Sequence, residues 1–254
     1  MKKIILGALF VSVLASSISY LQAADAKVDL YVVDTFNDMK VVYNEDGTVK
    51  AAANDMSYYR YKYAKGQVSR IDNFSYENHH FTDSTLISST NFTYQGNKLT
   101  ALKRETKDVV TNTTFTYDAS NKLTSVSDQN GTYSFKYNKA NQISNESQKV
   151  DNKAILSNDY TYDSKGNIAM ITDHDLTSGS AVKITLVNAY DKQGNLTKEN
   201  IKGFQAATTI TYKKITVKAS QKNAVMNQQS LFFKNTVLKR VYLLFEPIFA
   251  NNPE

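Results

Sequence analysis

The chain contains the segments FTYDASNKLT (residues 115–124), YTYDSKGNIA (residues 160–169) and NAYDKQGNLT (residues 188–197). Each has a tyrosine at the end of an apolar–polar alternation, then a short polar segment, then an aliphatic residue. Weaker copies occur on both sides, so the tyrosine recurs every 20 to 31 residues. The anchor tyrosines are Tyr43, Tyr63, Tyr94, Tyr117, Tyr137, Tyr162, Tyr190 and Tyr212. A repeat period in this range predicts an array of one small structural unit.

The polar segment after the tyrosine has the composition of a tight turn. Five copies place Asp or Asn first and Gly or Asn fourth. An Asp or Asn side chain accepts a backbone hydrogen bond across a turn, and Gly or Asn tolerates the left-handed conformation in which a type I turn rejoins its strand. The predicted left-handed turn residues are Gly47, Asn121, Asn141, Gly166 and Gly194.

The residues before each turn alternate as in a β-strand. Seven of the eight residues two positions before an anchor tyrosine are apolar or aromatic, whereas those one position before are mostly Thr or Lys. This pattern predicts an antiparallel sheet with one aromatic and one hydrated face. After the turn, apolar residues such as Leu123 and Val126 are three apart. Either a bulge after the turn or burial on both faces would reconcile this spacing with a strand.

These features predict an all-β fold, in which residues 27–219 form a repetitive antiparallel β-hairpin array with a single curved or partly rolled sheet. Seven to eight units of two strands correspond to roughly 14 to 16 strands. Residues 220–230 (SQKNAVMNQQS) are polar and are predicted to be a linker. Residues 231–254 are predicted to form an apolar cap, helical or a buried strand, that closes the array or covers its aromatic face.

Residues 1–24 have the features of a signal peptide. Lys2 and Lys3 precede an apolar stretch from Ile4 to Val13, the small residues 15–17 follow, and cleavage is expected after Ala23, Ala24 or Ala26. The apolar stretch is shorter than the roughly 20 residues of a membrane-spanning helix, which favours cleavage over an uncleaved anchor. The protein is therefore expected to be exported to the periplasm, the cell surface or the medium.

The composition limits the compatible functions. The chain has no cysteine, which excludes disulfides and zinc–thiolate sites. Its formal net charge is +6, and removal of Lys2 and Lys3 with the signal peptide leaves +4. The basic residues are scattered, without the Lys/Arg run or basic helix typical of nucleic-acid-binding proteins. We therefore expect no nucleic-acid partner and only weak attraction to acidic surfaces.

The residues with catalytic chemistry form no recognisable constellation. The three histidines are His79, His80 and His174, and neighbouring histidines on a strand point to opposite faces, so they do not chelate one ion. No G-x-S-x-G, H-E-x-x-H or glycine-rich phosphate-binding motif occurs. The turn aspartates recur once per repeat, which indicates turn geometry. We expect no catalytic residue, no metal site and no cofactor, hence a protein that is not an enzyme.

The phrases YDASNKLTSV, YDSKGNIAMI and YDKQGNLTKE resemble the YD repeat, Y-D-x-x-G-x-L-T, of the RHS/YD-repeat family. The resemblance extends from about Tyr43 to Tyr212. It implies a bacterial extracellular or surface protein built from successive β-hairpins. Long members curl into a hollow shell around a toxin, and YD arrays have been linked to carbohydrate binding. This chain has too few units to close a shell, and it lacks the proline-marked self-cleaving junction, since its only prolines are Pro247 and Pro253.

The ladder of aromatic and hydroxyl side chains suggests a binding function, because tyrosine faces stack on sugar rings while Thr, Asn and Lys donate hydrogen bonds. The leading hypothesis is an exported, non-enzymatic scaffold that binds a glycan or another cell-surface component. Its predicted ligand-binding residues are Tyr94, Tyr117, Tyr137 and Tyr162. The opposing interpretation places these tyrosines in the core.

Two further functions are compatible with the sequence. One is a structural or interaction protein of the cell envelope, which contacts a partner protein through sheet edges or the C-terminal segment. The other is an outer-membrane barrel, which export and many short strands would suit. It is less favoured, because the strand after Ile143 places Asn145 and Ser147 where a lipid-facing strand needs apolar residues. The expected partners are thus a polysaccharide or an envelope protein, with membrane contact only through residues 231–249.

Overall fold

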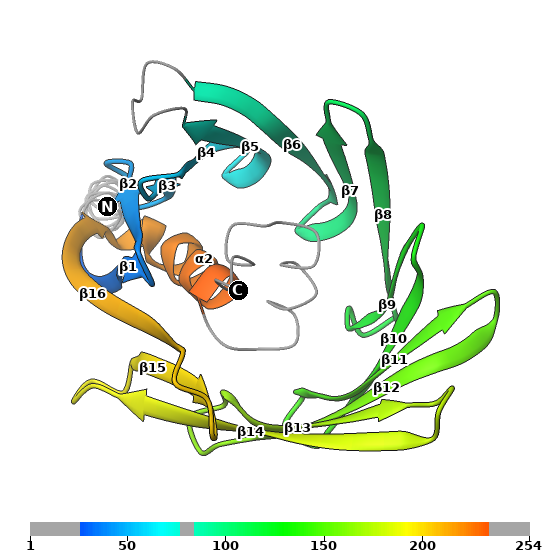
Figure 1. Ribbon diagram of the computed structural model, residues 1–254. Coiled ribbons are helices and arrows are strands. Elements are labelled where there is room, and N and C mark those ends of the chain that lie inside the picture. Colours follow the sequence, from blue (N-terminus) through cyan, green and yellow to red (C-terminus); the bar gives the residue numbers. More distant parts are fainter. Residues whose placement is uncertain (1–25, 77–83, 234–254) are drawn as a thin grey trace, which may run out of the picture.

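The computed structural model describes residues 26–76 and 84–233. In this part of the chain, antiparallel strands follow one another in a meander, and the first pairs with the last, so that the sheet closes into a sixteen-stranded barrel (Figure 1). The first eight strands are β1 (Lys27–Phe36), β2 (Met39–Tyr43), β3 (Val49–Ala53), β4 (Ser57–Ala64), β5 (Gln67–Tyr76), β6 (Ser84–Gln95), β7 (Lys98–Thr106) and β8 (Val110–Tyr117). The others are β9 (Leu123–Asp128), β10 (Gly131–Tyr137), β11 (Ile143–Val150), β12 (Lys153–Tyr162), β13 (Ile168–Asp175), β14 (Ser180–Tyr190), β15 (Leu196–Ile201) and β16 (Ala207–Lys218).

The all-β antiparallel fold is confirmed, but the sheet is closed and not merely curved or partly rolled. β1 pairs with β16 along its whole length, from Lys27 opposite Lys218 to Phe36 opposite Ile210. β1 precedes the first anchor tyrosine and has no counterpart in the repeat pattern. An open array would leave two edge strands with unpaired backbone groups, and closure gives these groups partners.

The turn after the anchor tyrosine has the same geometry in five hairpins. Between β8 and β9, the Asn121 N–H donates to the carbonyl oxygen of Asp118 over 3.0 Å, and the Asp118 N–H donates to the Lys122 carbonyl over 2.9 Å. The Asp118 side chain accepts hydrogen bonds from the backbone N–H groups of Ser120 and Lys122. The residues with positive φ at the fourth position are Gly47, Asn121, Asn141, Gly166 and Gly194.

A bulge directly after the turn accounts for the three-residue apolar spacing. Tyr117 pairs with Leu123, but the residue before Tyr117 pairs with Ser125, so Thr124 is an extra residue in β9. The extra residue places Leu123 and Val126 on the same face, and both are buried. The same register shift occurs at the anchor tyrosine in all seven hairpins of this kind. Of the two explanations for the spacing, the bulge is therefore correct.

The side chain of the bulge residue stabilises the bulge. The Thr124 hydroxyl donates to the carbonyl oxygen of Thr116 over 3.0 Å. Thr100 and Thr197 make the equivalent contact over 3.1 and 3.2 Å. A bulge locally disrupts the ladder, and the hydroxyl gives a strand carbonyl an additional partner there. This contact explains why threonine follows the aliphatic residue in several repeats.

Five anchor tyrosines connect their repeat unit to the unit before it. The Tyr137 hydroxyl donates to the carbonyl oxygen of Leu123 over 2.8 Å, and Leu123 is the aliphatic residue after the preceding turn. The equivalent pairs are Tyr63 with Val49, Tyr117 with Leu99, Tyr162 with Ile143, and Tyr212 with Leu196. Burial raises the pKa of Tyr212 to about 12, so the hydroxyl remains protonated and able to donate at neutral pH.

The unit of Tyr190 has a different arrangement. Asn188 stands where other units have an apolar residue, and its amide donates to the Ile168 carbonyl over 3.0 Å and to the Asp163 carboxylate over 2.8 Å. The Tyr190 hydroxyl donates to Asp163 instead of to the backbone. Asn167 completes the network with a 2.9 Å hydrogen bond to the Tyr190 hydroxyl. The polar Asn188 on the inner face is thus accompanied by polar neighbours that accept hydrogen bonds from its amide N–H groups.

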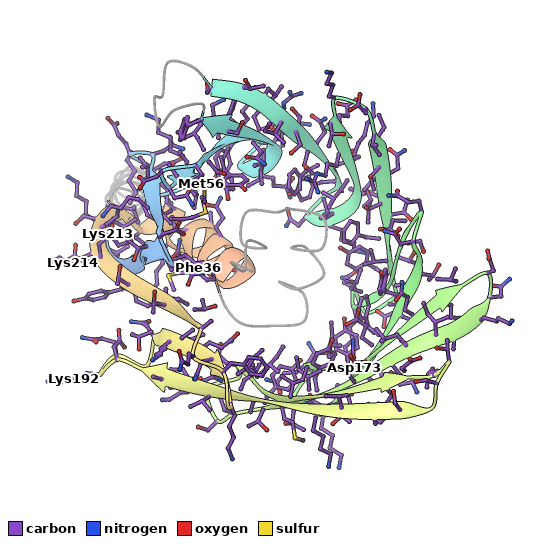
Figure 2. The ribbon with its side chains drawn as sticks, in the orientation of Figure 1. Phe36, Met56, Asp173, Lys192, Lys213 and Lys214 are labelled. Carbon is purple, nitrogen blue, oxygen red and sulfur yellow. The ribbon has the colours of Figure 1, made fainter. Side chains whose placement is uncertain are left out.

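The inner face of the barrel holds the apolar core, and the outer face is hydrated. The aliphatic residues after the turns, together with most of the residues two positions before the anchors, pack into clusters of buried side chains. Figure 2 shows Lys192 and Lys214 on the outer side of the ring and Phe36 on the inner side. The residues one position before the anchors are all exposed: Val42, Lys62, Thr93, Thr116, Lys136, Thr161, Ala189 and Thr211.

A helix follows the barrel where the sequence predicts a polar linker. η2 (Ala219–Gln221) and α2 (Lys222–Phe233) come directly after β16, and α2 lies inside the ring of strands (Figure 1). Val225 is completely buried in a cluster with Val217 and Val32. The prediction of a linker over residues 220–230 is therefore wrong. No helix among the described residues is long and apolar enough to span a bilayer.

Two glutamines explain why this polar segment docks onto the barrel. The Gln229 side chain accepts a hydrogen bond from the Val33 N–H over 2.8 Å and donates to the Tyr43 hydroxyl over 3.2 Å. Gln228 accepts from the Val49 N–H over 3.2 Å. These side chains satisfy backbone groups on the inner face and do not face water. The predicted signal peptide and residues 234–254 of the predicted cap lie outside the described residues.

Substitution of Tyr137 by Phe tests the connection between units. The change removes the hydroxyl that bonds the Leu123 carbonyl and keeps the ring, so we expect the free energy of unfolding to fall by about 1 kcal/mol. Equilibrium urea denaturation measures this difference. Tyr31→Phe is the matched control, since Tyr31 is 50% exposed on the outer face. Equal losses in the two variants would contradict the proposed role of the hydroxyl.

Candidate functional site

The four tyrosines that the sequence analysis selects as ligand-binding residues lie on the inner face and pack against one core cluster. They are Tyr94, Tyr117, Tyr137 and Tyr162, and all are half-buried. The hydroxyl groups of the last three bond the backbone of the preceding unit. The Lys98 ammonium lies 5.7 Å from the centre of one of these rings, and the Lys122 ammonium lies 5.4 Å from another. These contacts favour a structural role, and ligand binding by these tyrosines stays a prediction.

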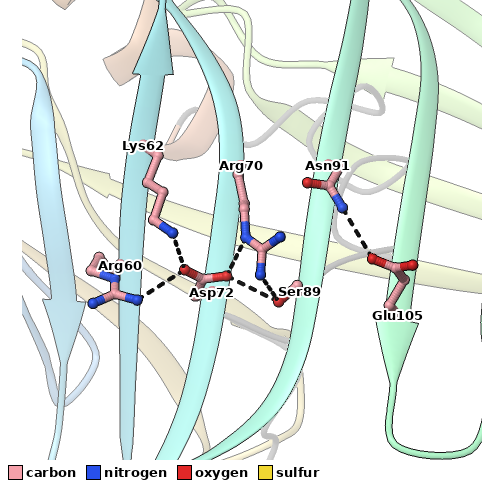
Figure 3. Close-up of polar contacts among 7 residues, drawn as sticks. All are labelled: Arg60, Lys62, Arg70, Asp72, Ser89, Asn91 and Glu105. Atoms are coloured by element: carbon pink, nitrogen blue, oxygen red, sulfur yellow. Dashed lines mark hydrogen bonds and ion pairs between the residues drawn. The ribbon is translucent and has the colours of Figure 1, made fainter.

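The outer face of β4 to β7 carries a second group of polar side chains, which strand register brings together in two rows. One row is Arg60, Asp72, Ser89 and Glu105, and the adjacent row is Lys62, Arg70, Asn91 and Lys103. We call these eight residues the outer polar grid. Neighbouring strands lie about 4.8 Å apart, so the grid extends over roughly 14 Å across four strands. Figure 3 shows most of its side chains and the contacts between them.

Asp72 lies at the centre of the charged contacts in the grid. One carboxylate oxygen is 3.1 Å from the Arg60 guanidinium and 2.9 Å from the Lys62 ammonium. The other accepts hydrogen bonds from Arg70 Nε over 2.5 Å and from the Ser89 hydroxyl over 2.9 Å. The Asp72 side chain is 2% exposed, whereas the three cations are 35 to 48% exposed. A carboxylate accepts about four hydrogen bonds, so its partners in the grid saturate Asp72.

The surroundings of Asp72 fix its charge. Burial raises the pKa of the Asp72 carboxyl, but hydrogen bonds from Lys62, Arg70 and Arg60 outweigh burial and hold that pKa well below its usual value. Asp72 is therefore ionised at any physiological pH. A saturated carboxylate of low pKa is poorly suited to act as a general base. Its effect is to position three cations side by side on the outer face.

The grid as a whole has an excess of positive charge. Glu105 pairs with Lys103 over 2.7 Å and accepts a hydrogen bond from Asn91 over 3.3 Å. Four cations thus face two carboxylates, which leaves a net charge of +2. A guanidinium has five N–H donors, and within the described residues Arg60 and Arg70 use fewer than five each. The grid therefore retains donors for an external anion.

Two aromatic rings border the grid on the same face. Tyr58 and Phe74 pair across β4 and β5, with ring centroids 6.0 Å apart. The Arg60 guanidinium lies 5.0 Å from the centre of the Phe74 ring. Half-buried rings next to fixed cations and amides provide both stacking surfaces and charged donors. These groups suit a sugar that carries acidic substituents.

Sequence reasoning did not identify this site. Its only local signal is the outward alternation of charges in short segments, such as Arg60 and Lys62 on β4, which is ordinary for a hydrated strand face. The contact between Asp72 and these cations depends on side-chain packing across β4 and β5, which the outward alternation alone does not show. No group of three or more His, Asp or Glu side chains in residues 26–76 and 84–233 is placed to hold a metal ion.

Comparison with known proteins gives similarities of structure only. No protein-family model and no curated protein sequence matches the chain. Among solved structures, a chain of the Photorhabdus luminescens Tc holotoxin pore is 10% identical with a TM-score of 0.33, and covers 69% of this chain. A TcdB2–TccC3 chain is 11% identical with a TM-score of 0.31, and covers 66%. This chain spans only 12% of the length of each of these toxin chains.

A porin-like protein from Bacteroides uniformis is also similar in structure. It is 13% identical with a TM-score of 0.38, and the match covers 74% of this chain and 97% of the porin-like chain. TM-scores this low support no conclusion about function for any of the three structures.

Substitution of Asp72 by Asn tests the central role of this carboxylate. We expect the free energy of unfolding at pH 7 to fall by about 2 kcal/mol, because three partly desolvated cations lose their counter-charge. The folded-state pKa of Asp72 is depressed, so its contribution is complete above the unfolded-state pKa near 4 and declines as the pH falls below it. Urea denaturation at pH 7 and at pH 3 should therefore show a smaller difference between wild type and variant at pH 3. A difference independent of pH would contradict this assignment.

Proposed function

We propose that this protein is an exported, non-enzymatic β-barrel that binds an acidic glycan of the cell surface through the outer polar grid. The observation that carries this proposal is the set of exposed cations fixed around the saturated Asp72, with a net charge of +2 and a bordering aromatic pair. Uronic acids and sulfated or phosphorylated sugars combine a ring that stacks on aromatic faces with an anion that pairs with Arg and Lys.

Features of the grid support a glycan over other partners. A site roughly 14 Å wide across four strands matches a few sugar residues rather than a whole protein surface, since stable protein interfaces bury about 800 Å² on each partner. The cationic excess is local, and the chain lacks the long basic stretch of nucleic-acid-binding proteins. The saturation of Asp72 favours binding over acid–base chemistry.

The same proposal reassigns the tyrosines of the repeat. Under this proposal, the anchor tyrosines stabilise the barrel from its inner face, and the residues that bind the glycan lie on the outer face. We infer relationship to the RHS/YD-repeat family from the recurrent YD phrases, such as that at Tyr162–Asp163. An outer-membrane barrel is less well supported, because a lipid-facing surface needs an apolar band and the outer positions named above are mostly Thr and Lys.

Glycan binding is tested on an array that includes uronic-acid, sulfated and neutral polysaccharides. We expect retention of acidic glycans that weakens as salt is raised, because salt screens exposed charges. The variant Arg60→Gln/Lys62→Gln should lose about tenfold or more in affinity, since each charge-assisted hydrogen bond contributes about 1.5–3 kcal/mol.

The matched control is Lys136→Gln/Lys192→Gln, which removes two exposed lysines outside the grid. Equal losses in both double variants would indicate a general charge effect and refute the grid as the site. Absence of binding to every acidic glycan by folded protein would refute the proposed function itself.

Export is tested by expression of the complete chain in a bacterial host, followed by fractionation and intact-mass measurement. We expect the protein outside the cytoplasm, with a mass that corresponds to cleavage near Ala24 or Ala26. Substitution of Leu6 and Leu9 by Asp, which interrupts the apolar stretch, should keep the protein unprocessed in the cytoplasm. An uncleaved chain in the exported fraction would contradict the predicted signal peptide.

A further inference from the structure

The turns at the two ends of the barrel differ in chemistry. In a meander, the turns that follow the anchor tyrosines all lie at one end, which we call the repeat-turn end, and the turns between units lie at the other, the linking end. The turns of the repeat-turn end are residues 44–48, 65–66, 96–97, 118–122, 138–142, 163–167 and 191–195. Apart from glycine and alanine, each residue in these turns is polar.

At the linking end, large apolar side chains protrude into water. Met56 between β3 and β4 is 57% exposed, and Val109 between β7 and β8 is 55% exposed. Leu176 between β13 and β14 is 47% exposed, and Phe204 between β15 and β16 is 67% exposed. We call these four residues the apolar tips. Four of the seven described linking turns carry one tip each, whereas none of the seven repeat turns carries one.

The folding of these turns does not require apolar side chains. The turn at Phe204 is held by a backbone hydrogen bond from the Phe204 N–H to the Ile201 carbonyl over 3.0 Å, and Gly203 supplies the positive φ of 92°. The turn that carries Leu176 is held by a backbone hydrogen bond from the Gly179 N–H to the Asp175 carbonyl over 2.9 Å. Any residue provides these backbone groups. Single exposed apolar residues are common on proteins, but their confinement to the turns of one end of a repetitive barrel points to a contact made by that end.

We propose that the linking end docks onto the surface of a lipid bilayer, with the apolar tips inserted at the boundary between headgroups and acyl chains. The tips are carried by four separate turns, so a single partner must touch the whole end of the barrel. A bilayer is laterally extended and deformable, and it accepts isolated apolar side chains at this depth. The described linking turns contain four aspartates (Asp38, Asp55, Asp108 and Asp151) and two lysines (Lys107 and Lys202), so the linking end has no excess of positive charge for anionic lipids, and docking rests on the apolar tips.

The turns between the tips favour a membrane over a second copy of the chain. Asp151–Asn152 and Gln129–Asn130 form polar linking turns at the same end. A rigid protein interface would desolvate these groups and require a hydrogen-bond partner for each, at a cost of about 1–3 kcal/mol for each one left unpaired. Among lipid headgroups the same groups remain hydrated while the tips leave water.

The absence of tryptophan from the chain makes a site-specific test possible. Phe204→Trp places one fluorophore at a tip, and Ser164→Trp places one in an exposed turn of the repeat-turn end. With phosphatidylcholine vesicles we expect a blue shift of emission for Phe204→Trp and none for Ser164→Trp. A shift in neither variant, or equal shifts in both, would overturn the proposal.

A second measurement uses vesicle sedimentation. Phe204→Ser should lower the partition coefficient by about tenfold or more, because one buried phenylalanine side chain is lost from the membrane contact. Phe204→Ser/Leu176→Ser should remove binding, while circular dichroism confirms the β-fold. Both variants should retain binding to acidic glycans, so failure here is distinct from failure of the proposed glycan site. Concentration-dependent dimers that form without vesicles and disappear in the double variant would assign the tips to self-association and overturn the proposal.

Discussion

The hydrogen bond from an anchor tyrosine to the backbone of the preceding repeat unit is the interaction on which the barrel depends. It requires a side chain that extends from one hairpin to the next and carries a hydroxyl as hydrogen-bond donor. The Tyr137 hydroxyl, for example, donates to the carbonyl oxygen of Leu123. The bulge after each turn makes this contact possible, because it aligns the aliphatic residue directly opposite the tyrosine of its own hairpin. The turn, the bulge and the tyrosine therefore form one structural motif that is repeated along the chain.

This motif constrains the side chains of the inner face and leaves those of the outer face free to vary. The unit that contains Asn188 shows the consequence of a change on the inner side, since one polar residue there is accompanied by hydrogen bonds among Tyr190, Asp163 and Asn167. A similar exchange occurs where Glu146 replaces an apolar residue and accepts a hydrogen bond from Tyr160 over 2.6 Å. The outer face carries no such requirement, so charges like those of the polar grid can gather there.

The sequence was sufficient for the local rules of the fold. The alternation around Tyr117 and the Asp118–Asn121 turn predict a hairpin, and β8 and β9 form one. Closure was not predictable in the same way, because β1 lies outside the repeat and its pairing with β16 is set by the total curvature of sixteen strands. α2 is not predicted by the sequence pattern, because its polar residues are typical of a solvent-exposed segment. In the structure, however, the side chains of Gln228 and Gln229 accept hydrogen bonds from backbone N–H groups of the barrel. The outer polar grid is not recognisable in the sequence, because each of its charges is ordinary for a hydrated strand until the pairing of consecutive strands brings Asp72 next to Arg60 and Ser89.

The two proposed surfaces follow from one geometric fact. In a closed meander, the inner positions and the turns of one end belong to the repeat, since the tyrosine, the bulge and the left-handed turn residue must all be kept. Only the outer strand positions and the linking turns are released from these constraints. Two features that depart from ordinary hydrated surface fall in these released regions: the cations around Asp72 on the outer face, and the exposed side chains of Phe204 and Leu176 at the linking end. A repeat that fixes its interior so completely restricts new binding functions to these places.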